Sequence, residues 1–106
     1  MTKERFDEFV RELLDEIDAK LTCKGKEYNL EEDRLGFFKR AAGLGGTPEK
    51  ALFGFMLKHI VSVSDMVAYE RYFEMSVWKE KLIDIMDYCA LLLALEEEKE
   101  KEEAKI

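Results

Sequence analysis

The chain has 106 residues, of which 47% are hydrophobic and 39% charged, with a single proline and a formal net charge of −7. This length supports one domain with one hydrophobic core, and the composition is typical of a soluble, helix-rich protein. The negative charge repels phosphate backbones, so we expect no binding to duplex nucleic acid. Binding of a small nucleotide together with a divalent cation remains compatible with this negative charge.

The two cysteines, Cys23 and Cys89, follow no metal-binding or redox spacing. Cys89 lies inside an apolar run and is expected to be a small core residue. The N-terminus is charged and resembles no signal peptide, and no apolar run approaches the roughly 20 residues that a membrane span needs. We therefore expect a cytoplasmic protein with no membrane partner.

The first half of the chain predicts two helices. Apolar residues at steps of three and four predict an amphipathic helix over residues 3–22. The segment 22–29, "TCKGKEYN", is expected to end it, with Gly25 as the stop. Residues 30–44 predict a shorter helix, and the acids in its first turn are explained by the helix dipole.

The second half predicts two more helices. In "GLGGTPEK", Thr47 suits the N-cap and Pro48 the first position of a helix over residues 48–70, which is apolar on most sides and therefore central. Ser76 is the expected N-cap of the last helix. Residues 96–106 are expected to form a charged, frayed tail.

No alternating strand pattern is present, so the sequence predicts an all-α, four-helix-bundle-like domain over residues 1–95. Two of its helices are nearly all apolar. Together they present more apolar surface than a single four-helix monomer can bury. We therefore expect a homo-oligomer, either a dimer or a tetramer.

The run "EKLIDIMDYCALLLAL" contains two aspartates within an apolar helix. At about 100° per residue, Asp84 and Asp87 share one face with Glu80. Because apolar residues such as Leu95 continue this face, we expect another helix to cover it. The opposite side, expected to be the ordinary core, holds Trp78, Leu82, Ile85, Met86, Cys89, Leu92 and Leu93.

The central helix carries a narrow stripe of small and polar residues that is a candidate partner for the aspartates: Ala51, Gly54, Lys58, Ser62 and Asp65. In one interpretation, Lys58 forms a buried ion pair with Asp84 or Asp87. In the other, the aspartates bind Mg²⁺ and Lys58 neutralises a substrate phosphate. The single histidine, His59, is expected to be a core or boundary residue.

Four fragments together resemble a known group of proteins: "KGKEYN", "EDRLGFFKRAA", "ALFGFMLKHIVSVSDM" and "WKEKLIDIMDYCALLL". They are similar to small phage and bacterial nucleotide-modification-associated proteins. That group is in turn similar to the all-α, MazG-like nucleotide pyrophosphohydrolases, which are helical oligomers that bind Mg²⁺ and cleave nucleoside triphosphates to monophosphates. The resemblance implies a MazG-like fold and a Mg²⁺-dependent, nucleotide-associated function.

The resemblance also implies roles for individual residues. The metal ligands would be Asp84 and Asp87, with Glu80 as a further candidate that the helix dipole also explains. Catalytic roles would fall to Glu32, Asp33 and Lys58, with a carboxylate as base for metal-assisted attack of water. Substrate contacts would come from Lys24, Tyr28 and Lys58.

The alternative is a non-catalytic helical oligomer, or an accessory or adaptor protein, in which the acids form structural ion pairs. The Glu-Glu-x-x-Glu half of the pyrophosphohydrolase motif is represented only by Glu31 and Glu32, and an incomplete acidic set is what this alternative predicts. A hydrolase requires four or more carboxylates that converge on a pocket open to solvent.

Overall fold

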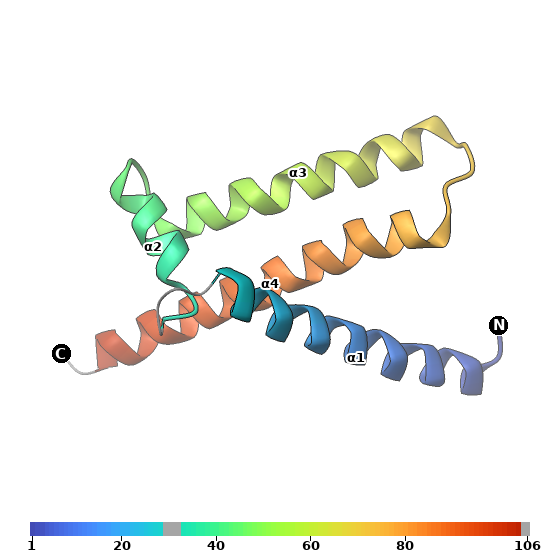
Figure 1. Ribbon diagram of the computed structural model, residues 1–106, viewed down its shortest axis with the longest axis horizontal. Helices are drawn as coiled ribbons and strands as arrows, with labels where there is room; N and C mark the ends of the chain where they lie inside the picture. Colours follow the sequence, from blue (N-terminus) through green and yellow to red (C-terminus); the bar gives the residue numbers. More distant parts are fainter. Residues whose placement is uncertain (29–32, 105–106) are drawn as a thin grey trace. The chain divides into compact units, whose positions relative to one another are not determined.

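A computed structural model describes the backbone of residues 1–28 and 33–104 and the side chains of residues 1–22 and 33–104. It contains four helices, α1 (Lys3–Tyr28), α2 (Gly36–Gly43), α3 (Pro48–Tyr69) and α4 (Met75–Ala104), and the described residues include no strand (Figure 1). The all-α prediction is confirmed. The chain divides into two compact units, Met1–Arg34 and Leu35–Ile106, where the sequence predicted one domain over residues 1–95.

The first unit consists of α1, which continues to Tyr28 instead of ending at residue 22. Gly25 was expected to end this helix. A single glycine inside a helix lowers its stability by only about 1 kcal/mol relative to alanine, and the segment 22–29 contains no proline that would break the helix. The outer face is polar, as predicted: the Arg5 guanidinium lies 3.3 Å from Glu12 and 3.5 Å from Glu8.

In the second unit, α2 is shorter than predicted because it begins at Gly36 and not at residue 30. Asp33 therefore precedes the helix and does not lie in its first turn. The predicted start of α3 is confirmed, since the Thr47 hydroxyl accepts a hydrogen bond from the backbone N–H of Lys50 at 3.2 Å and Pro48 is the first helical residue.

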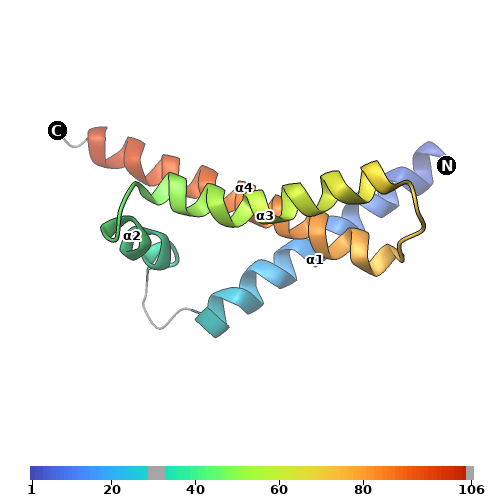
Figure 2. The same cartoon turned by 90° about the horizontal axis from the view of Figure 1, so that it is seen from above.

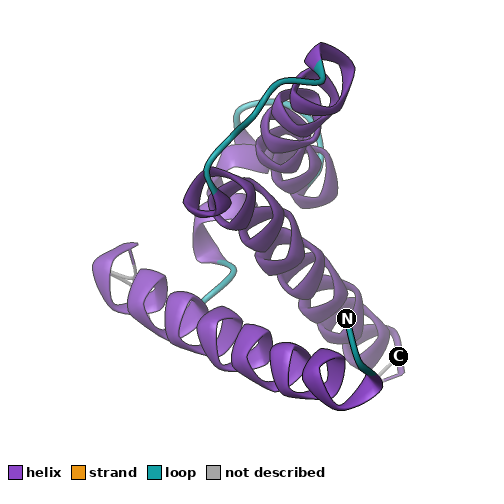
Figure 3. Ribbon diagram, turned by 90° about the vertical axis from the view of Figure 1, so that its right-hand side faces the viewer, coloured by secondary structure: helices purple, strands orange, loops and turns teal. Residues whose placement is uncertain are grey.

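Helices α3 and α4 run antiparallel and form a hairpin, with α2 beside the N-terminal end of α3 (Figures 1 and 2). Loops connect α2 to α3 and α3 to α4 (Figure 3). The inward side of α3 holds the buried or half-buried residues Leu52, Met56, His59, Val63 and Met66. Because these residues alternate in steps of four and three, they form one continuous seam against α4. We call these five residues the inward stripe.

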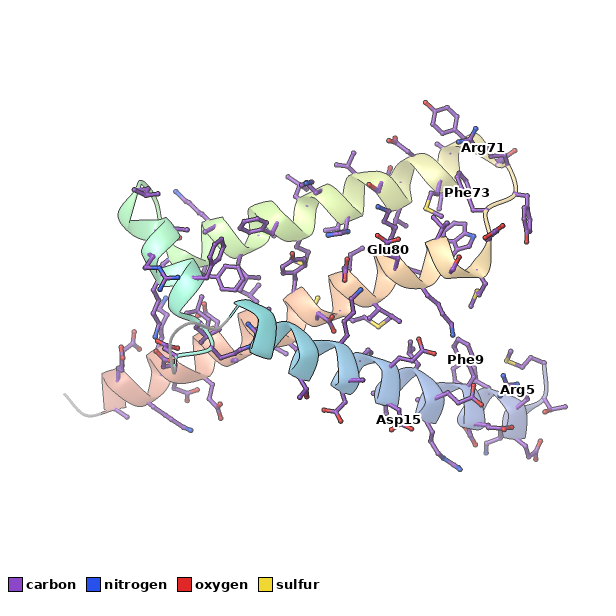
Figure 4. All side chains as sticks on the ribbon, viewed as in Figure 1. Arg5, Phe9, Asp15, Arg71, Phe73 and Glu80 are labelled. Carbon is purple, nitrogen blue, oxygen red and sulfur yellow. The ribbon has the colours of Figure 1, made fainter. Side chains whose placement is uncertain are left out.

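The turn between α3 and α4 is closed by a residue in the left-handed conformation. Glu70 has φ of 51° and ends α3. Beyond it, the Arg71 guanidinium lies 5.0 Å from the centre of the Phe73 ring, and Phe73 packs edge-on against Trp78 (Figure 4). Helix α4 then begins at Met75, one residue before the predicted cap Ser76.

The charged C-terminal segment is helical as far as Ala104, as a continuation of α4. Two ion pairs tie it to the rest of the unit. Glu98 binds Lys39 of α2, and the Lys99 ammonium lies 2.8 Å from Glu49 of α3. The apparent tail is therefore part of the hairpin.

The side of α4 that was expected to be the ordinary core is largely exposed. The exposed residues are Leu82, Met86, Cys89 and Leu93, of which Leu93 retains 72% of its accessible surface. The acidic side of α4 is the buried one. Within the second unit α4 therefore packs on α3 through its acidic side, while Trp78, Ile85 and Leu92 on the side that was expected to be the core are half-buried.

One helix among the described residues, α3, is long and apolar enough to cross a membrane when judged by length and composition alone. The sequence predicted no such segment. The core helix of a soluble protein meets the same criterion when it is mostly buried, whereas 17% of the apolar segment of α3 is buried. Helix α3 also carries Lys58 and Asp65 within its length.

Leu52, near the N-terminal end of α3, is 0% exposed. We expect Leu52→Ala to lower the free energy of unfolding by about 2–5 kcal/mol, because truncation removes buried apolar contacts and leaves a cavity. Urea denaturation followed by circular dichroism measures the loss. The control is Leu44→Ala, which makes the same change at an exposed position; equal losses for the two variants would contradict this packing.

The hydrogen bond from Lys99 lowers the pKa of the Glu49 carboxyl below its ordinary value. The pair therefore stabilises the fold at pH values above the ordinary carboxyl pKa, and this contribution is lost as the pH falls through the lowered pKa of Glu49. In Lys99→Gln we expect the pKa of Glu49 to rise toward its ordinary value in an NMR titration. Lys101→Gln, whose lysine pairs with Glu97 instead, should leave Glu49 unchanged.

Candidate functional site

The strongest candidate site is the buried acidic pair of α4. Asp84 is 7% exposed and Asp87 is 2% exposed, and both oxygens of the Asp87 carboxylate are shielded from solvent. The two residues lie one turn apart on the same side of the helix. The prediction that this acidic face is covered is confirmed. Burial of a carboxylate is costly unless polar groups compensate it, so the surroundings of the pair decide its role.

Asp84 meets a histidine and not the predicted lysine. The Nε2 atom of His59 on α3 lies 3.6 Å from Oδ2 of Asp84, and both side chains are mostly buried. This distance is too long for a direct hydrogen bond, but it is short enough for an ion pair whenever the imidazole is protonated. The contact joins the two helices at the middle of the hairpin.

A row of aromatic rings extends from this contact toward α2. The ring of His59 lies 5.8 Å from that of Tyr88, and Tyr88 stacks on Phe55 with ring centres 6.4 Å apart. Phe55 in turn contacts Phe38 at 6.1 Å and Phe37 at 5.6 Å. Rings at these separations pack favourably, by about 0.5–1.5 kcal/mol per pair beyond the area they bury. The row therefore borders the Asp84–His59 contact on the side toward α2, where Tyr88 packs against His59.

Within the second unit, the structure does not bring the other described candidates to the acidic pair. Lys58 is exposed and makes no ion pair with any described residue. Glu80 is exposed on the N-terminal half of α4 (Figure 4) and, with the helix starting at Met75, lies beyond the first turn. Asp65 is exposed on α3. Asp33 belongs to the first unit, and its role as a catalytic residue stays a prediction.

The interpretation that pairs Lys58 with Asp84 is wrong, and the reason is geometric. Lys58 and His59 differ by about 100° around the helix, and the inward stripe places His59 toward α4. Lys58 consequently points away from the hairpin seam. Lys58 and Asp65, the two charged members of the small and polar stripe, are exposed, so neither opposes the aspartates.

Three predicted site residues lie outside the part of the chain whose side chains the structure describes: Lys24, Tyr28 and Glu32. Their roles as substrate-binding and catalytic residues stay predictions.

The described side chains do not by themselves supply a magnesium site. Within residues 1–22 and 33–104, no three His, Cys, Asp or Glu side chains lie close enough together to hold a metal ion. Mg²⁺ prefers six oxygen ligands in octahedral geometry, several of them water. Asp84 and Asp87 would need further oxygen donors from elsewhere.

Sequence reasoning missed His59 as the partner of Asp84. The signal was present in the spacing, because His59 continues the four-and-three pattern of Leu52, Met56 and Met66. That pattern predicts which side of α3 packs inward.

Comparisons with protein-family models, with curated proteins and with solved structures found no match.

The contact between Asp84 and His59 makes a measurable prediction. We expect Asp84→Asn and His59→Phe each to lower the free energy of unfolding, and the double variant to lose less than the sum, with a coupling of about 0.5–3 kcal/mol. Phenylalanine retains a ring against Tyr88, so the change isolates the polar contact. Chemical denaturation of all four proteins completes the cycle.

The matched control is Lys58→Ala, next to His59 but on the exposed side of α3. We expect this variant to stay within about 0.5 kcal/mol of the wild type. Additive losses in the cycle, or a large effect at Lys58, would refute the assignment of His59 as the partner of Asp84.

Proposed function

We propose that this protein is a non-catalytic helical oligomer in which the buried acids serve the structure. The observation that carries the proposal is the contact of Asp84 with His59 across the α3–α4 hairpin. A buried polar contact of this kind favours one register of two helices over its neighbours, because a slip leaves a carboxylate without compensation.

Three properties of the described residues support this proposal over hydrolysis. No group of three metal-ligating side chains occurs among them. Lys58, the residue that would offset charge on a phosphate, lies on the outward side of α3, and Glu80 is exposed. In addition, the hairpin exposes apolar side chains on both helices, as expected of a chain that packs against other subunits.

A second candidate function is Mg²⁺-dependent nucleotide binding, with pyrophosphohydrolase activity as its enzymatic form. The observation that favours it is the position of Asp87, a second buried carboxylate one turn from Asp84. Two adjacent buried carboxylates are typical of sites that titrate or bind cations. Water and the phosphates of the nucleotide would supply most of the remaining oxygens. With a net charge of −7, a small nucleotide is a more compatible partner than a duplex nucleic acid.

Thermal melting with and without Mg²⁺ distinguishes the two candidates. We expect the same Tm in both conditions for a structural acidic pair. A metal that binds only the folded state at a hundredfold excess over its Kd would instead add about 2.7 kcal/mol, which raises the Tm of a domain of this size by several degrees.

The informative variant in this experiment is Asp87→Asn, and its matched control is Asp65→Asn, an exposed acid on α3. A Mg²⁺-dependent rise in Tm that is lost in Asp87→Asn and retained in Asp65→Asn would overturn the structural proposal in favour of the second candidate. Isothermal titration with a nucleoside triphosphate would then identify the ligand.

A further inference from the structure

We draw no further inference here: the strongest candidate, the exposed apolar side of α3 formed by Phe53, Leu57, Ile60 and Val67, carries none because nothing in the described part of the chain shows what covers it.

Discussion

The rotation of α3 about its own axis, as it packs on α4, is the constraint on which the other features of this protein depend. The inward stripe buries Leu52 completely and Met56 and Met66 nearly so, and these apolar contacts outweigh any single polar contact in free energy. A helix held by such a stripe cannot turn by 100° without exposing it. The rotation therefore dictates that His59 faces Asp84 and that Lys58 faces away.

The chemical character of the buried acids follows from this rotation. An inward lysine would have given Asp84 a permanent cation, whereas histidine is charged only when protonated. The stacked rings of Phe55 and Tyr88 flank the contact and restrict the space around it. The acids occupy a rigid, largely apolar site that is well suited to fixing helix register. Among the described residues it lacks the converging oxygens that a hard cation requires.

The same rotation decides what remains outside. Because the inward stripe faces α4, the apolar residues offset from it by one position, such as Phe53, Ile60 and Val67, are turned away from α4. The acidic contact and this second apolar side of α3 are therefore two consequences of one packing arrangement, and Lys58 and Asp65 lie on the exposed, polar side of the helix.

Much of the local structure could be read from the sequence. Apolar periodicity predicted all four helices, and the Thr47–Pro48 signal predicted the start of α3, because caps and periodicity depend on near neighbours in the chain. The burial of Asp84 and Asp87 was also predicted, since apolar residues continue their face. Which residue meets Asp84, which side of α4 is exposed, and whether residues 96–104 join the fold were decided only by the tertiary structure. These features depend on how far each helix rotates and how long it continues against its neighbour, and that is a collective outcome of packing that no local pattern specifies.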